Sequence, residues 1–117
     1  MPHVVLRGKP VIDDIFQALK PLMIRDEHGI LRTTEAYLDS KKKTILIESL
    51  SIQGNTTINF LAMISAREDG VVIRLYPKHE VEKTDGVKRL LAKLALQLLK
   101  TFPDFQLGET NLNEYLI

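Results

Sequence analysis

The side chains that could do chemistry in this sequence are two glutamates, an arginine and a tyrosine: Glu35, Glu48, Arg74 and Tyr76. They fall in consecutive segments that are expected to be strands joined by short turns. If those strands pair through their turns, Glu35 lies opposite Glu48, and Arg74 and Tyr76 share the same sheet face. Opposed carboxylates repel, and burial of such a pair raises one pKa, as in general acid and base catalysis. Neutralisation of the pair by Arg74 or Arg67 is the competing interpretation.

A second candidate site is the stretch TDGVKR, Thr84 to Arg89, at the expected start of a helix. The N-terminal end of a helix attracts anions through its free N–H groups and its dipole. Lys88 and Arg89 would add positive charge there, so they form a candidate anion-binding pair. Simple capping of the helix by Thr84 or Asp85 is the alternative.

Several other kinds of chemistry have no support in the sequence. There is no cysteine, so thiol catalysis and disulfides are excluded. The histidines His3, His28 and His79 are isolated in the sequence, and no serine stands in a nucleophile elbow. No glycine-rich phosphate loop is present. We therefore expect no metal and no cofactor, and the sequence favours a protein that is not an enzyme.

Composition indicates an ordinary globular protein. The chain has 117 residues, of which 44% are hydrophobic and 26% are charged, and its formal net charge is +1. One domain spanning residues 1–117 is expected from this length. The near-neutral charge does not favour a nucleic-acid partner. No run of apolar residues is long enough to span a bilayer, and no signal peptide is evident, so no membrane partner and a cytoplasmic location are expected.

Hydrophobic periodicity and turn residues predict seven elements. Two helices are expected, one starting near Val11 and kinking or ending at Pro21, and one over about 86–102. Five strands are expected over His3–Arg7 and about 30–39, 44–52, 56–67 and 71–76. Short turns between the last four strands require an antiparallel meander. The tail after Pro103 has no assignable structure.

The predicted fold class is therefore α+β, with the element order β-α-β-β-β-β-α. Both helices should pack on one face of an antiparallel four- to five-stranded meander sheet, giving a two-layer sandwich. The core face would collect one set of alternating residues: Ala36, Leu38, Ile45, Ile47, Phe60, Ala62, Ile64, Ile73 and Leu75.

The opposite face, called the second face below, is unexpectedly apolar. It collects Leu31, Tyr37, Leu46, Leu50, Ile52, Leu61, Met63, Val72 and Tyr76, with Glu35, Glu48 and Arg74 among them. An antiparallel sheet with one face in water should be polar on that face. Large apolar patches on soluble proteins mark interaction sites. The residues expected in an interface are Tyr37, Leu46, Leu50, Leu61, Met63 and Val72, with Leu46, Leu50, Leu61 and Met63 at its centre.

Three covers for the second face remain open: the C-terminal tail, a second copy of the chain, or a ligand. The favoured hypothesis is a small interaction module that forms a homodimer through this face. The alternative is a small-ligand binder or enzyme that uses Glu35, Glu48 and Arg74. A nucleic-acid accessory protein using Lys41, Lys42, Lys43 and the last helix is a further alternative. It is disfavoured because the face carries carboxylates and lacks interleaved basic and aromatic residues.

Overall fold

Seven strands form one antiparallel sheet in the computed structural model, which describes residues 1–117. The order of strands across the sheet is β2-β3-β4-β5-β6-β1-β7. Along the chain the elements are β1 (His3–Arg7), α1 (Ile12–Ala18), β2 (Met23–Asp26), β3 (Gly29–Leu38), β4 (Thr44–Gln53), β5 (Thr56–Arg67), β6 (Gly70–Leu75), α2 (Asp85–Thr101), β7 (Gln106–Thr110) and a 3-10 turn η1 (Asn113–Tyr115). The α+β class, the antiparallel meander and the two helices are confirmed, whereas the expected count of four or five strands is wrong.

The first additional strand, β2, follows the expected kink or end of the first helix at Pro21, in a stretch where no strand was predicted. Helix α1 ends at Ala18, and Leu19 already has extended backbone angles. Pro21 follows closely and cannot continue a helix, and it also disfavours helical geometry in Lys20, the residue before it. The chain then pairs Met23–Asp26 with β3 through a tight turn at Glu27 and His28. Its apolar residues therefore belong to an edge strand rather than to a helix.

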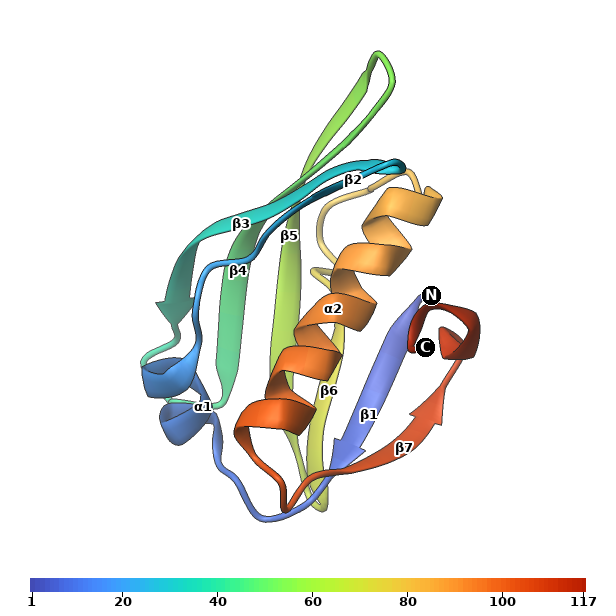
Figure 1. The fold of residues 1–117 in the computed structure, drawn as a ribbon. Helices are drawn as coiled ribbons and strands as arrows, with labels where there is room; N and C mark the ends of the chain where they lie inside the picture. Colours follow the sequence, from blue (N-terminus) through green and yellow to red (C-terminus); the bar gives the residue numbers. More distant parts are fainter.

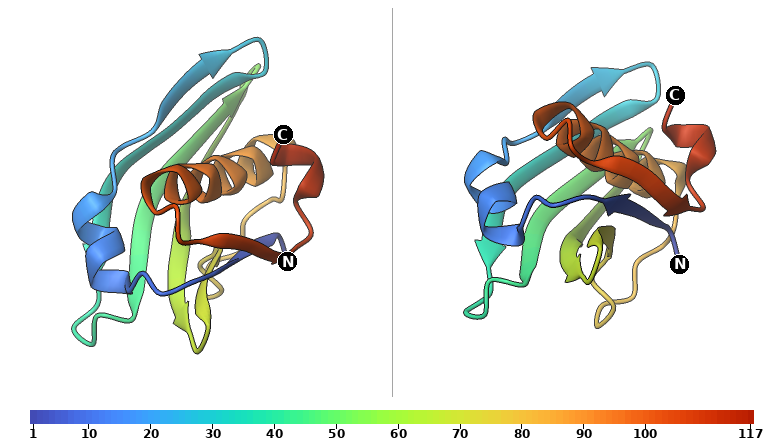
Figure 2. Two further views of the ribbon diagram at one scale, coloured as in Figure 1. Left: turned by 60° about the horizontal axis from the view of Figure 1, so that its bottom comes forward. Right: turned by 90° about the horizontal axis from the view of Figure 1, so that it is seen from below.

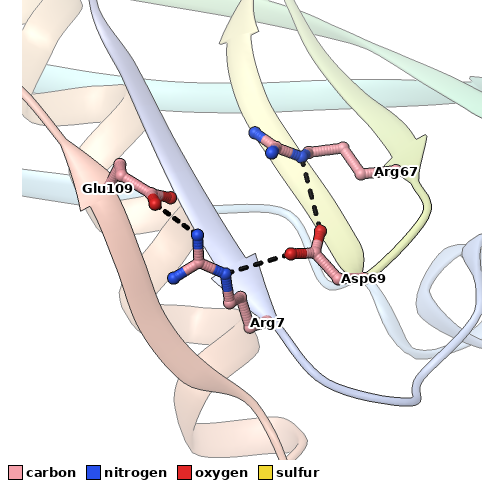
Figure 3. A network of polar contacts seen from close by, with 4 residues as sticks. All are labelled: Arg7, Arg67, Asp69 and Glu109. Atoms are coloured by element: carbon pink, nitrogen blue, oxygen red, sulfur yellow. Dashed lines mark hydrogen bonds and ion pairs between the residues drawn. The ribbon is translucent and has the colours of Figure 1, made fainter.

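The second additional strand, β7, lies in the tail, where the sequence predicted nothing. It pairs with β1 at the opposite edge of the sheet from β2. An ionic network fastens this edge: Arg7 on β1 is paired with Glu109 on β7 and with Asp69 in the β5–β6 turn (Figure 3). Arg67 is also paired with Asp69, at 3.6 Å. Hydrogen bonds to Arg7 raise its pKa and lower those of Asp69 and Glu109.

The sheet curls around α2, which lies along its inner face (Figures 1 and 2). This curl replaces the flat two-layer sandwich that was expected. One core of 21 buried residues joins the inner face to both helices, and it includes Ile12 and Ile15 of α1 and Leu90, Leu94 and Leu98 of α2. Burial of each such side chain contributes roughly 1.5–3 kcal/mol. Neither helix has both the length and the hydropathy needed to cross a membrane.

The pairing of β4 with β5 follows the predicted register, with Glu48 opposite Leu61 and Leu46 opposite Met63. A turn at Asp69 and Gly70, which the sequence predicts, would place Met63 opposite Tyr76. The turn is formed instead by Glu68 and Asp69, so the β5–β6 register differs by two residues from that prediction. Met63 is consequently opposite Arg74 and not Tyr76. A shift of two residues keeps every side chain on its predicted face, since strand side chains alternate with a period of two.

The pairing of β3 with β4 contains a bulge between Thr33 and Ala36, and here the prediction fails in part. Beyond the bulge the register is the predicted one, with Tyr37 opposite Leu46. Before the bulge the strand is displaced by one residue, so Leu31 pairs with Ser51 and turns into the core, where it is 1% exposed. An extra residue in one strand reverses the faces of everything on its far side. The assignment of Leu31 to the second face is therefore wrong.

Candidate functional site

The second face of the sheet carries the predicted interface residues together. Leu46, Leu50, Leu61 and Val72 are half-buried, Met63 is buried, and the ring of Tyr37 is 50% exposed. They lie on four neighbouring strands, β3 to β6, in the registers given above. Phe60 and Ile73 point to the opposite side, into the core around α2. The two faces are thus separated as predicted, apart from Leu31.

The C-terminal tail does not cover the second face. Leu112 is buried in the core that contains α2, and Tyr115 and Leu116 pack against the same core. The Tyr115 hydroxyl donates a 2.7 Å hydrogen bond to Asp85 in the first turn of α2. The tail is therefore attached on the helix side, and one of the three predicted covers is removed.

A cavity of about 540 Å³ opens on the second face. Its lining comes from β3, β4, β5 and the segment between β6 and α2: Arg32, Thr34, Glu48, Ser49, Leu50, Asn59, Phe60, Leu61, His79, Glu80 and Val81. The residues after β6 reach the cavity because β6 ends at Leu75. The next residue, Tyr76, still donates its N–H to the Leu61 carbonyl at 3.0 Å. Cavities of roughly 300–1,000 Å³ with mixed polar and apolar walls are typical of ligand sites.

Glu48 is the best-organised polar group in this cavity. The Tyr37 hydroxyl donates to one carboxylate oxygen at 2.9 Å, and the Thr34 hydroxyl donates to the other at 3.2 Å. The bond to Glu48 raises the pKa of Tyr37, and partial burial and the charges of Glu48 and Glu35 act in the same direction. Glu48 has no ion-pair partner in the chain. Its carboxylate is positioned by two hydroxyl groups and keeps lone pairs for a further donor.

The predicted opposition of Glu35 and Glu48 is altered by the bulge, because Glu35 shares the position opposite Glu48 with Thr34. Of Thr34 and Glu35, it is Thr34 that donates a hydrogen bond to the Glu48 carboxylate. Glu35 lies at a separate cavity of about 320 Å³, between α1 and β3. Both glutamates are exposed. The arrangement does not form the buried carboxylate pair that acid–base catalysis would need.

Arg74 and Tyr76 lie beside the cavity rather than in its lining. Arg74 is half-buried, and its Nε atom is buried without a hydrogen-bond partner. Tyr76 packs edge to face on His79, with ring centroids 5.2 Å apart. A buried N–H without a partner costs roughly 1–3 kcal/mol, so such groups call for an explanation.

The candidate anion pair is at the other side of the molecule, at the start of α2. Arg89 forms a 2.7 Å ion pair with Asp26 of β2. The helix N–H groups are also engaged: Gly86 donates to the Gln53 side chain, and Val87 donates to the Thr84 hydroxyl. No ion pair involves Lys88. These contacts favour the capping interpretation, and anion binding here stays a prediction.

The cavity also contains residues that sequence reasoning missed. Arg32 and Thr34 lie on the second face only because of the bulge, and no pattern in the sequence indicates a bulge there. The segment His79–Val81 forms a wall of the cavity, although the sequence indicated only that His79 is isolated from other histidines. No group of three potential metal ligands occurs in the chain.

Comparison with known proteins identifies no relative for this chain. No family model matches the sequence, and neither a curated protein nor a solved structure matches it.

Proposed function

We propose that this chain is a small non-enzymatic interaction module that forms a homodimer through the second face of its sheet. The observation that carries the proposal is the concentration of apolar side chains there, on a face that neither helix nor the tail covers. The molecule measures 40 × 30 × 24 Å, so the face is large enough for the roughly 800 Å² per partner that a stable dimer buries. Tyrosine, methionine and arginine, present here as Tyr37, Met63 and Arg74, are enriched in such interfaces.

Light scattering on the unmodified protein at tens of micromolar tests the proposal directly. We expect twice the chain mass of 13.3 kDa. The variant Leu61→Lys places a charge at the centre of the face, where an unpaired buried charge costs several kcal/mol, so it should be monomeric. Val11→Lys is the matched control, because Val11 is 56% exposed at the start of α1, away from the second face.

The result that contradicts the dimer is a monomer of the unmodified protein. A folded Leu61→Lys variant that still dimerises, with the same affinity as Val11→Lys, would instead place the interface elsewhere.

A second candidate function is the binding of a small ligand, and the cavity around Glu48 favours it. Glu48 and Arg32 supply opposite charges, while Leu50, Leu61 and Val81 supply apolar contact. This candidate replaces the dimer if the unmodified protein is monomeric. Of the predicted ligand residues only Glu48 lines this cavity, whereas Arg74 lies beside it and Glu35 lines a separate cavity.

A further inference from the structure

Glu48 and Arg74 are charged side chains of the second face that make no ion pair within the chain. Glu48 accepts hydrogen bonds only from the hydroxyl groups of Thr34 and Tyr37. Arg74 is half-buried, makes no ion pair, and has a buried Nε atom without a hydrogen-bond partner. A guanidinium that is partly removed from water and unpaired is unfavourable by itself, and a carboxylate is its best complement.

The strand registers place these two groups symmetrically about β5. Glu48 on β4 is opposite Leu61, and Arg74 on β6 is opposite Met63. Leu61 and Met63 are two residues apart on β5. The midpoint between Glu48 and Arg74 therefore lies on β5, between Leu61 and Met63. The two charged residues are separated by two strand spacings of about 4.8 Å each, besides the offset along the strands.

We propose that the dimer is isologous, with a two-fold axis that lies in the plane of the interface and passes over β5 between Leu61 and Met63. Each Glu48 then pairs with Arg74 of the partner subunit. This inference rests on the proposed dimer and adds its symmetry and its specific contacts. In an isologous interface, if residue i contacts residue j of the other copy, then j contacts i in return. An axis perpendicular to the line from Glu48 to Arg74 satisfies that rule with two equivalent ion pairs.

The same axis explains the arrangement of the surrounding side chains. Half-buried Leu61 flanks the axis and supplies apolar surface there, Met63 on the other side of the axis is already buried within the chain, and the charged pairs stand on either side. Buried apolar contacts with polar groups around them are the usual anatomy of a stable interface. The hydroxyl groups of Thr34 and Tyr37 hold the Glu48 carboxylate in place before association, which lowers the ordering cost of binding.

Charge reversal tests the pairing. Glu48→Arg and Arg74→Glu should each raise the dimer dissociation constant by at least about tenfold, since like charges would then meet in the interface. The double variant Glu48→Arg with Arg74→Glu restores opposite charges and should recover most of the affinity. Sedimentation equilibrium gives the constants for all four proteins. Glu68→Arg and Lys9→Glu are the matched controls, because both residues are exposed and make no ion pair.

Neutral variants provide a second test that does not depend on the charge-reversed variants folding correctly. Glu48→Gln and Arg74→Gln keep approximate shape, and each should weaken the dimer. Their combination should cost clearly less than the sum of the two single effects, because both remove the same contact.

The outcomes separate this inference from the proposed function. A dimer whose affinity is unaffected by the single reversals, or not recovered in the double variant, overturns the Glu48–Arg74 pairing and leaves the dimer standing. A monomeric unmodified protein overturns both.

Discussion

At the scale of single residues, a tyrosine hydroxyl bonded to a carboxylate occurs twice, at two separate places. Tyr37 donates to Glu48 on the second face, and Tyr115 donates to Asp85 at the start of α2. A neutral hydroxyl that donates to a carboxylate resists ionisation, because ionisation would set two negative charges side by side. The first bond positions a group of the candidate site, and the second attaches the tail to the helix.

Because of the contact between Tyr115 and Asp85, the free energy of unfolding depends on pH in the alkaline range. The bond to Asp85 raises the pKa of Tyr115 from 10.0 to about 12. The folded protein therefore keeps this proton at a pH where the unfolded chain releases it, so the contribution is complete below pH 10 and is lost as pH rises towards 12. Tyr115→Phe should reduce the free energy of unfolding below pH 10, with a smaller difference at higher pH.

Urea unfolding of the two proteins at a series of pH values checks this expectation. Tyr76→Phe is the control, because the hydroxyl of Tyr76 makes no hydrogen bond to a carboxylate. A difference between the unmodified protein and Tyr115→Phe that stays constant through the alkaline range would contradict the argument.

At the scale of elements, close packing of α2 on β4 depends on the absence of a side chain at Gly86. A Cβ atom at this position would lie 1.9 Å from the Ser51 hydroxyl oxygen and 3.1 Å from its Cβ. Ser51 is 2% exposed, so it has little room to move away. The glycine lets the first turn of α2 rest directly on the sheet, while Thr84 caps the helix.

Gly86→Ala should therefore destabilise the protein although alanine is the better helix former. The propensity gain of up to about 1 kcal/mol is opposed by overpacking, which typically costs about 1–3 kcal/mol. In a Ser51→Gly background the same change should cost less, because both Ser51 atoms near the added methyl group are gone and only the Gln53 side-chain oxygen, at 3.1 Å, remains close. Urea unfolding of the four proteins measures this coupling. Equal costs in both backgrounds would show that Ser51 is not the obstacle.

At the scale of the whole molecule, the curled sheet is closed at one edge by contacts between distant parts of the chain. Arg7, near the N terminus, joins Glu109 in the tail and Asp69 in the β5–β6 turn (Figure 3). The side-chain bonds from Arg7 lower the pKa values of Asp69 and Glu109. Groups with lowered pKa values stabilise the fold above their ordinary pKa, and that stability is lost as pH falls through the lower, folded value.

Arg7→Gln should make the protein less sensitive to acid. For the unmodified protein, the free energy of unfolding should decrease as pH falls below the ordinary values of 4.5 for Glu109 and 3.8 for Asp69. The variant starts from lower stability at neutral pH and should show a shallower decrease. Arg25→Gln is the control, since Arg25 is exposed and makes no ion pair. Parallel curves for the unmodified protein and Arg7→Gln would contradict the prediction.

Much of the fold and part of the candidate site could be predicted from the sequence. Alternation of apolar residues, together with tight turns, located β3 to β6 within about one residue, and the period of two placed Leu46, Leu50, Leu61 and Met63 on the second face. Helical spacing and Thr84 located α2 in the same way. These features are local, because the hydrophobic pattern that predicts a strand or a helix lies in residues that are close together in the sequence.

Only the tertiary structure decided the features that depend on distant segments. The bulge in β3 moved Leu31 into the core and placed Thr34 together with Glu35 opposite Glu48, although no pattern in the strand itself indicates a bulge. Strands β2 and β7 exist because β3 and β1 offer them free edges. The tail packs with α2 because the curled sheet leaves room for Leu112 in the core. The sequence by itself therefore determined the elements and their faces, while pairing partners, bulges and edges follow from contacts that form only in the folded chain.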